Sequence, residues 1–486
     1  MTVAVALPSL TLSEDEETAL GFLRQRLYKV NTKNQFKAGL YEGKHSAYDL
    51  GISAPAGLTD LVNAVIGWPG TVVDVTEERL DFLGWSSPTD LGLSGVMADN
   101  NLDVESGRTH LDALTYGCGF VAVGLGDRSA GEPDIMVSAE STMGCTVDWD
   151  YRLRRARSAY SQTRDIFGVV VSESLYLPNE TIRFEQVNGR LTVMDRSVHN
   201  MGRVPVVRMV NRERASDVDG RSEITRAVTY LTDAAIRTLL GMEINREFYT
   251  TPKWTMLNTD PEVFGLDEDA SPERNRAAGW KATAGRMNVI PPQADVNGEP
   301  IEPKLHEFNP APPTPYIDQI KAYSQLLAAE SGIPAPYLGF VTDNPSSADS
   351  IRQQEYRLVK RAERRQKSFG LAWREVAYLA ILLRDGAVDP QAFREVSVKW
   401  QDAATPTRAA AADEAAKLIG AGVLPADSTV TYDRVGLSPQ EQDQLTRDRQ
   451  RSTVTDLVAG LRQSAAAAKT DPQVADLAGR SVANGR

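Results

Sequence analysis

The chain has 486 residues, of which 65 are acidic and 53 are basic, so its formal net charge is −12. This length suggests about three structural units of ~150 residues each, and a hydrophobic fraction of 42% excludes a collagen-like or wholly disordered protein. The excess of acid also argues against a protein whose whole surface binds nucleic acid, because phosphate binding requires an excess of Lys and Arg.

Cysteine usage and hydropathy add two expectations. The two cysteines, Cys118 and Cys145, lie neither in a CxxC pair nor at a zinc-binding spacing. We therefore expect two buried apolar side chains in a reducing cytoplasm. No run of ~18 apolar residues occurs, which predicts that the chain has no membrane span.

The N-terminal part of the chain shows mixed helix and strand patterns. Ser13 and Glu16 have the spacing of a capping box, which predicts that a helix begins there. The apolar patterns that follow predict a short helix at 59–66, strands at 72–75 and 80–85, and a helical segment at 90–116.

From residue 120 to residue 210 the apolar period changes to two. Val121, Val123 and Leu125 alternate with other residues, as strand residues with one buried face do. Asn188-Gly189, between two further strand-like segments, is a strong hairpin signal. These patterns predict an antiparallel sheet and, together with the helices, an α+β fold.

The remainder of the chain is mainly helical, with one insert. The insert, 254–310, is rich in Pro, Gly, Asp and Asn, and the tight segment 334–345 separates two later helices. The patterns predict helices at 223–250, 314–331, 347–384, 407–420 and 439–469, and short strands at 253–257 and 287–290.

The candidate catalytic and cofactor motifs lack the sequence context that their chemistry requires. The loose GxGxxA at Gly117–Ala122 follows a helix and opens a strand, the reverse of a dinucleotide-binding turn. His306-Glu307 lacks the second His of a zinc helix, and His110 is best interpreted as structural. We expect no catalytic residue, no metal site and no cofactor.

Two concentrations of charge remain, and each has two readings. The segment 352–367 carries seven basic and two acidic side chains. It is either a solvated basic face or a face that meets an acidic neighbouring subunit or DNA. Its candidate contact residues are Arg357, Lys360, Arg361, Arg364 and Arg365.

The second concentration is acidic and lies inside the Pro/Gly-rich insert. It is either a solubilising loop or a protruding contact surface for a basic partner. Its candidate residues are Asp260, Glu262, Asp267, Glu268 and Asp269.

Several short motifs occur together and carry a resemblance. They are the runs Gly332-Ile333-Pro334-Ala335-Pro336-Tyr337-Leu338-Gly339, Asn344-Pro345-Ser346-Ser347-Ala348-Asp349 and Glu355-Tyr356-Arg357-Leu358-Val359, with Gly220-Arg221-Ser222-Glu223 upstream. With these motifs the chain resembles tailed-bacteriophage portal proteins, and is most similar to the SPP1-type portals of actinobacterial phages. The resemblance covers roughly residues 20 to 400.

The resemblance implies a portal-type fold with seven parts. They are a wing at 1–220, a stem helix at 221–251, a clip at 252–312, a second stem helix at 313–331, a tunnel loop at 332–346, a long wing helix and strand at 347–404, and a helical crown at 405–486.

The resemblance also implies a function and a set of partners. Such chains form a ring, expected to be a dodecamer, at one capsid vertex, and double-stranded DNA is packaged and ejected through it without sequence specificity. The implied partners are the large terminase subunit, a head-tail adaptor, the major capsid protein and scaffold, and no membrane. The protein would be made in the host cytoplasm and reside in the virion.

The tunnel loop would line the channel with Thr342, Asp343, Asn344 and Pro345. This stretch contains no Lys or Arg, which suits a ring that must not hold the phosphates passing through it. Two alternatives remain: another head-tail connector or scaffold protein, and a cytoplasmic hydrolase with a cryptic site.

Overall fold

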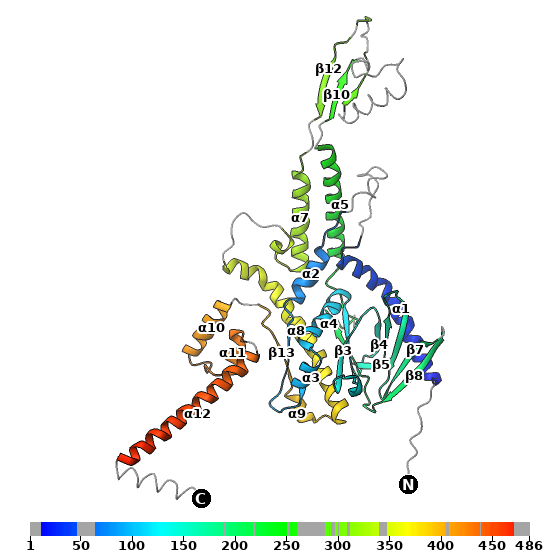
Figure 1. The fold of residues 1–486 in the computed structure, drawn as a ribbon. Helices are drawn as coiled ribbons and strands as arrows, with labels where there is room; N and C mark the ends of the chain where they lie inside the picture. Colours follow the sequence, from blue (N-terminus) through cyan, green and yellow to red (C-terminus); the bar gives the residue numbers. More distant parts are fainter. Residues whose placement is uncertain are drawn as a thin grey trace. The chain divides into compact units, whose positions relative to one another are not determined.

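The computed structural model contains helices and β-strands within one unit, which confirms the α+β class (Figure 1). The chain divides into two compact units, Met1–Ala404 and Thr405–Arg486. The structure describes residues 11–45, 64–187, 190–216, 219–249, 253–259, 287–290, 292, 297–299, 301–308, 312–339, 348–404, 408–437 and 439–470.

The first unit begins with two helices. Helix α1 (Glu14–Tyr41) has the capping box predicted from Ser13 and Glu16, with both reciprocal hydrogen bonds present. Helix α2 (Trp68–Glu77) begins with Pro69 in its first turn, where the missing N–H of proline costs nothing.

Helix α2 corrects two predictions. The strand predicted at 72–75 is wrong, because Val72 and Val73 lie inside α2 and are both buried. A short apolar run cannot distinguish a strand from a helix that is covered on several sides. Of the helix predicted at 59–66, the part at 64–66 is not helical, and residues 59–63 lie outside the described residues.

The helical segment predicted at 90–116 is two helices, α3 (Leu93–Asp99) and α4 (Leu102–Tyr116). Asn101 separates them with a left-handed φ of 47°, a conformation that asparagine tolerates better than most residues. The side chain of Asn100 donates to the carbonyls of Val96 and Ile135, so the break is tied to the neighbouring sheet.

Two antiparallel sheets confirm the predicted change of period. One has three strands in the order β3-β2-β9, and the other has five in the order β4-β5-β6-β7-β8. Val187 pairs with Arg190, and the turn predicted between them at Asn188-Gly189 lies outside the described residues. The strands are β2 (Cys118–Leu125), β3 (Ile135–Glu140), β4 (Cys145–Asp150), β5 (Arg155–Arg164), β6 (Val170–Tyr176), β7 (Glu180–Val187), β8 (Arg190–Val198) and β9 (Val206–Val210), and a 3-10 turn, η1, covers Arg128–Ala130.

Two helices, α5 (Arg226–Tyr249) and α7 (Thr314–Ser331), lie side by side (Figure 1). Between them in sequence comes a three-stranded sheet with β10 (Lys253–Leu257) at its centre. It pairs with β11 (Met287–Val289) in parallel and with β12 (Lys304–Phe308) in antiparallel. The two helices and the first two strands were predicted, whereas β12 was not.

The longest helix, α8 (Ala348–Asp385), supplies the centre of the main core. Its Phe369, Trp373 and Val376 are almost fully buried and pack with residues from α2, α4, α5 and the β3-β2-β9 sheet. Strand β1 (Phe82–Ser86) pairs with β13 (Ser397–Trp400), and the short segments η3 (Ala335–Leu338) and α9 (Pro390–Arg394) flank α8 in sequence. Pairing of β1 with β13 therefore joins strands that precede and follow α8 in sequence.

The second unit is helical. It contains α10 (Arg408–Gly420), α11 (Thr429–Val435) and α12 (Pro439–Thr470). The outer two helices match the predictions closely, while α11 was not predicted. Among the described residues of both units, no helix is both long enough and apolar enough to span a bilayer.

Candidate functional site

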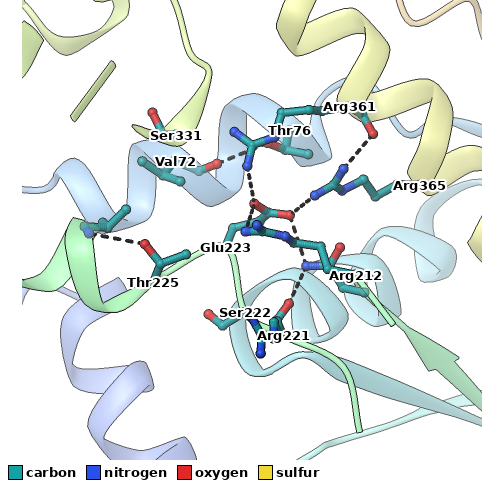
Figure 2. A network of polar contacts seen from close by, with 12 residues as sticks. Val72, Thr76, Arg212, Arg221, Ser222, Glu223, Thr225, Ser331, Arg361 and Arg365 are labelled. Carbon is teal, nitrogen blue, oxygen red and sulfur yellow. Dashed lines mark hydrogen bonds and ion pairs between the residues drawn. The ribbon is translucent and has the colours of Figure 1, made fainter. Parts of the chain in front are cut away.

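A buried carboxylate lies where the segment leading into α5 meets α8 (Figure 2). Glu223 is only 3% exposed. Three guanidiniums surround it: Arg365 at 2.5 Å, and Arg361 and Arg212 at 3.5 Å each. We call these four residues the Glu223 cluster.

The backbone around Glu223 fixes the position of its carboxylate. The N–H of Glu223 donates to the carbonyl of Leu114 at the end of α4, at 2.8 Å. Asn211 donates through its amide to the Glu223 carboxylate at 3.1 Å and to the Arg221 carbonyl at 2.7 Å. The carboxylate is thus held from the loop after β9, from α4 and from α8.

The surrounding guanidiniums keep the Glu223 carboxylate charged. Burial opposes the charged form of Glu223, but Arg365, Arg361 and Arg212 together outweigh burial, so the pKa of Glu223 lies below its usual range. Burial, offset in part by Glu223, lowers the pKa of Arg361 to about 10. Glu223 and Arg361 are therefore both ionised at neutral pH.

The basic face of α8 also holds the end of α7. Arg357 donates to the carbonyl of Ala329 in the last turn of α7 at 2.7 Å, where the helix dipole favours a cation. Gly332 leaves room for the arginines of this face, because a Cβ at that position would lie 2.8 Å from Nη1 of Arg361 and 3.3 Å from Nε of Arg357. One face of α8 thus contacts both the segment that leads into α5 and the last turn of α7.

The remaining candidate residues on α8, Lys360 and Arg364, have different surroundings from Arg357, Arg361 and Arg365. Lys360 pairs with Glu363, one turn along the same helix, at 2.6 Å, and Arg364 is exposed. Contact of Lys360 and Arg364 with another subunit or with DNA stays a prediction.

Two sets of predicted site residues lie outside the described part of the chain. They are the tunnel-loop residues Thr342, Asp343, Asn344 and Pro345, and the acidic residues Asp260, Glu262, Asp267, Glu268 and Asp269. Their expected roles stay predictions.

Sequence reasoning did not identify Glu223 and Arg212 as partners of the basic face. Glu223 is 142 residues from Arg365 along the chain, and its only local signal is a carboxylate just before a helix. Arg212 lies in a loop whose sequence gives no sign of an ion pair.

His110 and the two cysteines are buried or partly buried within the first unit. His110 is fully buried and accepts a hydrogen bond from Nε1 of Trp373 at 2.9 Å, and burial lowers its pKa to about 3. Cys145 is buried and Cys118 is partly buried, and burial raises the pKa of Cys118 to about 11. In the part of the chain that the structure describes, no three His, Cys, Asp or Glu side chains are grouped as metal ligands.

Comparison with known proteins decides the family. The profile of the family described as "Phage portal protein, SPP1 Gp6-like" matches residues 72–452. The chain belongs to this portal family. A "Portal protein" of Mycobacterium phage D29 is 31% identical over 419 residues, covering 84% of this chain and 83% of the relative. A "Portal protein" of Mycobacterium phage L5 is 30% identical over 421 residues with the same coverage.

Solved structures give weaker likenesses to this portal-family chain. A chain of the virion of the native gene transfer agent particle has a TM-score of 0.40 at 16% identity, over 76% of this chain and 89% of its own length. A chain of the neck of the empty gene transfer agent particle has a TM-score of 0.41 at 16% identity, over 80% and 95% respectively. Likenesses of this size support no inference about assembly or partners.

Proposed function

We propose that twelve copies of this chain form a ring at one vertex of a phage capsid, and that double-stranded DNA enters and leaves the capsid through it. Membership of the portal family carries this proposal, since the match covers residues 72–452 and the named relatives are portal proteins. The role is structural, and the chain contributes no catalytic residue. It acts in the virion after synthesis in the host cytoplasm.

The parts of the fold take the following roles in this proposal. The two antiparallel sheets with α1 to α4 are the wing, and α5 and α7 are the stem helices. The β10–β12 sheet belongs to the clip, α8 crosses back through the wing, and the second unit is the crown. The Glu223 cluster and Arg357 then join the stem to the wing.

The charge distribution suits passage of DNA without retention. Each phosphate that a protein neutralises adds to its affinity for DNA, and Thr342, Asp343 and Asn344 offer no cation. Arg361 and Arg365 face Glu223 of the same chain, so the basic helix has fewer free charges than its sequence suggests. We place the tunnel loop at the channel wall.

The proposal assigns partner contacts to three parts of the chain. The acidic residues Asp260, Glu262, Asp267, Glu268 and Asp269 would meet basic surfaces on the large terminase subunit and on the head-tail adaptor. The wing and the crown would meet the major capsid protein and scaffold.

Native mass spectrometry and negative-stain images of the purified full chain test the ring. We expect closed rings with a central hole and a mass that is twelve times 53.1 kDa. A protein that stays monomeric or dimeric at every concentration would contradict the proposal. A gel-shift comparison of two unrelated duplexes adds a second test, because a preference for either sequence would contradict the channel role.

A further inference from the structure

A cavity of about 560 Å³ lies between α1, β2, β9 and the segment that leads into α5. We call it the wing cavity. Seven of its lining side chains are basic, whereas Asp219 is the single acidic one among the described residues that line it. Its size suits a small ligand or a single side chain rather than a duplex.

Arg208 on β9 is the most deeply buried of these cations. Its side chain is 2% exposed, and its guanidinium lies over the ring of Trp149 at 3.9 Å from the centroid. The nearest carboxylate oxygens, on Asp219 and Glu213, are 3.7 and 3.8 Å away, which is beyond hydrogen-bonding distance. Its Nε and Nη1 have no hydrogen-bond partner among the described residues.

The one carboxylate among the described lining residues already pairs with another lining cation. Asp219 accepts a hydrogen bond from Nη2 of Arg26 at 2.6 Å, and Nε of Arg26 is itself buried without a partner in the described ranges. Among the described residues, Arg208 and Arg26 therefore hold buried N–H donors in the wing cavity for which no acceptor is present. A buried donor of a charged group is costly when it is left unsatisfied.

Lys37 adds a third buried cation. It is 9% exposed, and its Nζ lies 3.4 Å from the carbonyl of Tyr116, a long hydrogen bond. Burial, with the nearby charge of Lys33, lowers the pKa of Lys37 to about 8. A neighbouring negative charge would stabilise this ammonium as well as both guanidiniums.

We propose that the wing cavity binds an oxyanion, which accepts hydrogen bonds from Arg208 and Arg26 and pairs with Lys37. Phosphate and carboxylate share the required chemistry, since both accept bonds from guanidinium groups at short distance. The oxyanion comes either from a free phosphate group or from a carboxylate of a second copy of the chain in the ring.

Binding of inorganic phosphate to the full-length protein tests the site. Calorimetry and thermal unfolding are followed with sodium phosphate against sodium chloride at equal ionic strength, on dilute monomer. We expect phosphate to bind one site per chain and to raise the unfolding temperature more than chloride does.

Three variants locate the site. Arg208→Gln should weaken phosphate binding by roughly tenfold to a hundredfold, the effect of losing hydrogen bonds from a charged group. Lys33→Gln, at an exposed position on the rim, should weaken it by a smaller factor and keeps the test informative if Arg208→Gln does not fold. Arg108→Gln, whose side chain is 71% exposed outside the cavity, should bind as the wild type does.

Assembled rings distinguish the two sources, and this arm alone rests on the ring proposed above. Phosphate binding by both monomer and ring indicates a free phosphate group as the ligand. Binding by the monomer alone indicates that a neighbour's carboxylate fills the cavity in the ring. The proposal is overturned if phosphate has no more effect than chloride on the monomer, or if Arg208→Gln, Lys33→Gln and Arg108→Gln all bind phosphate as the wild type does.

Discussion

At the scale of single residues, buried charge is arranged so that removal of one partner is costly. Glu223 balances three guanidiniums, of which that of Arg365 is nearly as buried as the carboxylate itself. Most of the cost of losing such a carboxylate comes from the cations it leaves behind, rather than from the pair's own attraction.

Replacement of Glu223 by Gln should lower the free energy of unfolding of the first unit by about 3–5 kcal/mol, because three cations then face a neutral amide. Urea unfolding followed by tryptophan fluorescence measures the loss. The matched control is Glu105→Gln, whose carboxylate pairs with the exposed Arg108 and which should cost less than about 1 kcal/mol. Equal losses of unfolding free energy in the two variants would show that the buried Glu223 carboxylate matters no more to stability than the carboxylate of an exposed ion pair.

His110 should make the first unit sensitive to mild acid. Its pKa is lowered to about 3 in the folded chain from an ordinary value of 6.5, so between these values the unfolded chain binds a proton that the folded chain does not. Stability must therefore fall as the pH falls below 6.5, by about 1.4 kcal/mol per pH unit from this group.

The variant His110→Gln separates this effect from that of the carboxylates. Its amide oxygen can still accept the hydrogen bond from Trp373, but it does not titrate. Between pH 6 and pH 4.5 we expect the stability of the wild type to fall more steeply than that of the variant, by about 1.4 kcal/mol per pH unit. Parallel pH profiles from urea unfolding would refute the expectation.

At the scale of elements, close backbone approach fixes how α4 meets β2. Gly119 is the second residue of β2, and a Cβ built there would lie 2.6 Å from the carbonyl oxygen of Thr109 in α4. The Thr109 carbonyl belongs to the backbone of α4, so it cannot move away from such a Cβ as the end of a flexible side chain could. The helix and the strand therefore pack at a separation that only glycine allows.

Alanine substitutions at two glycines should accordingly change the stability of the first unit in opposite directions. Gly119→Ala should destabilise the first unit by about 1–3 kcal/mol, because α4 and β2 must separate. Gly21→Ala, in the interior of α1 with open space around its Cβ, should stabilise by about 0.5–1 kcal/mol through higher helix propensity. The midpoints of urea unfolding check both signs, and a destabilising Gly21→Ala would contradict the helix argument.

At the scale of the whole molecule, local signals predicted most of the elements and missed the contacts between them. Thr314–Ser331 was predicted with its observed bounds because Gly332 ends the helix in a left-handed conformation. Val72 was assigned to a strand although it lies in α2. The local sequence does not show that the rest of the fold covers this helix on several sides. The Glu223 cluster could not be predicted, since its members come from three separate segments.

The separation of those segments also dictates when the first unit can finish folding. At ~5–20 residues per second, the 142 residues between Glu223 and Arg365 take roughly ten seconds to translate. During that interval the carboxylate has no cation from α8, and Phe369 and Trp373 have not yet reached the core. The nascent first unit must therefore wait in an incomplete state on the ribosome until most of the chain has been synthesised.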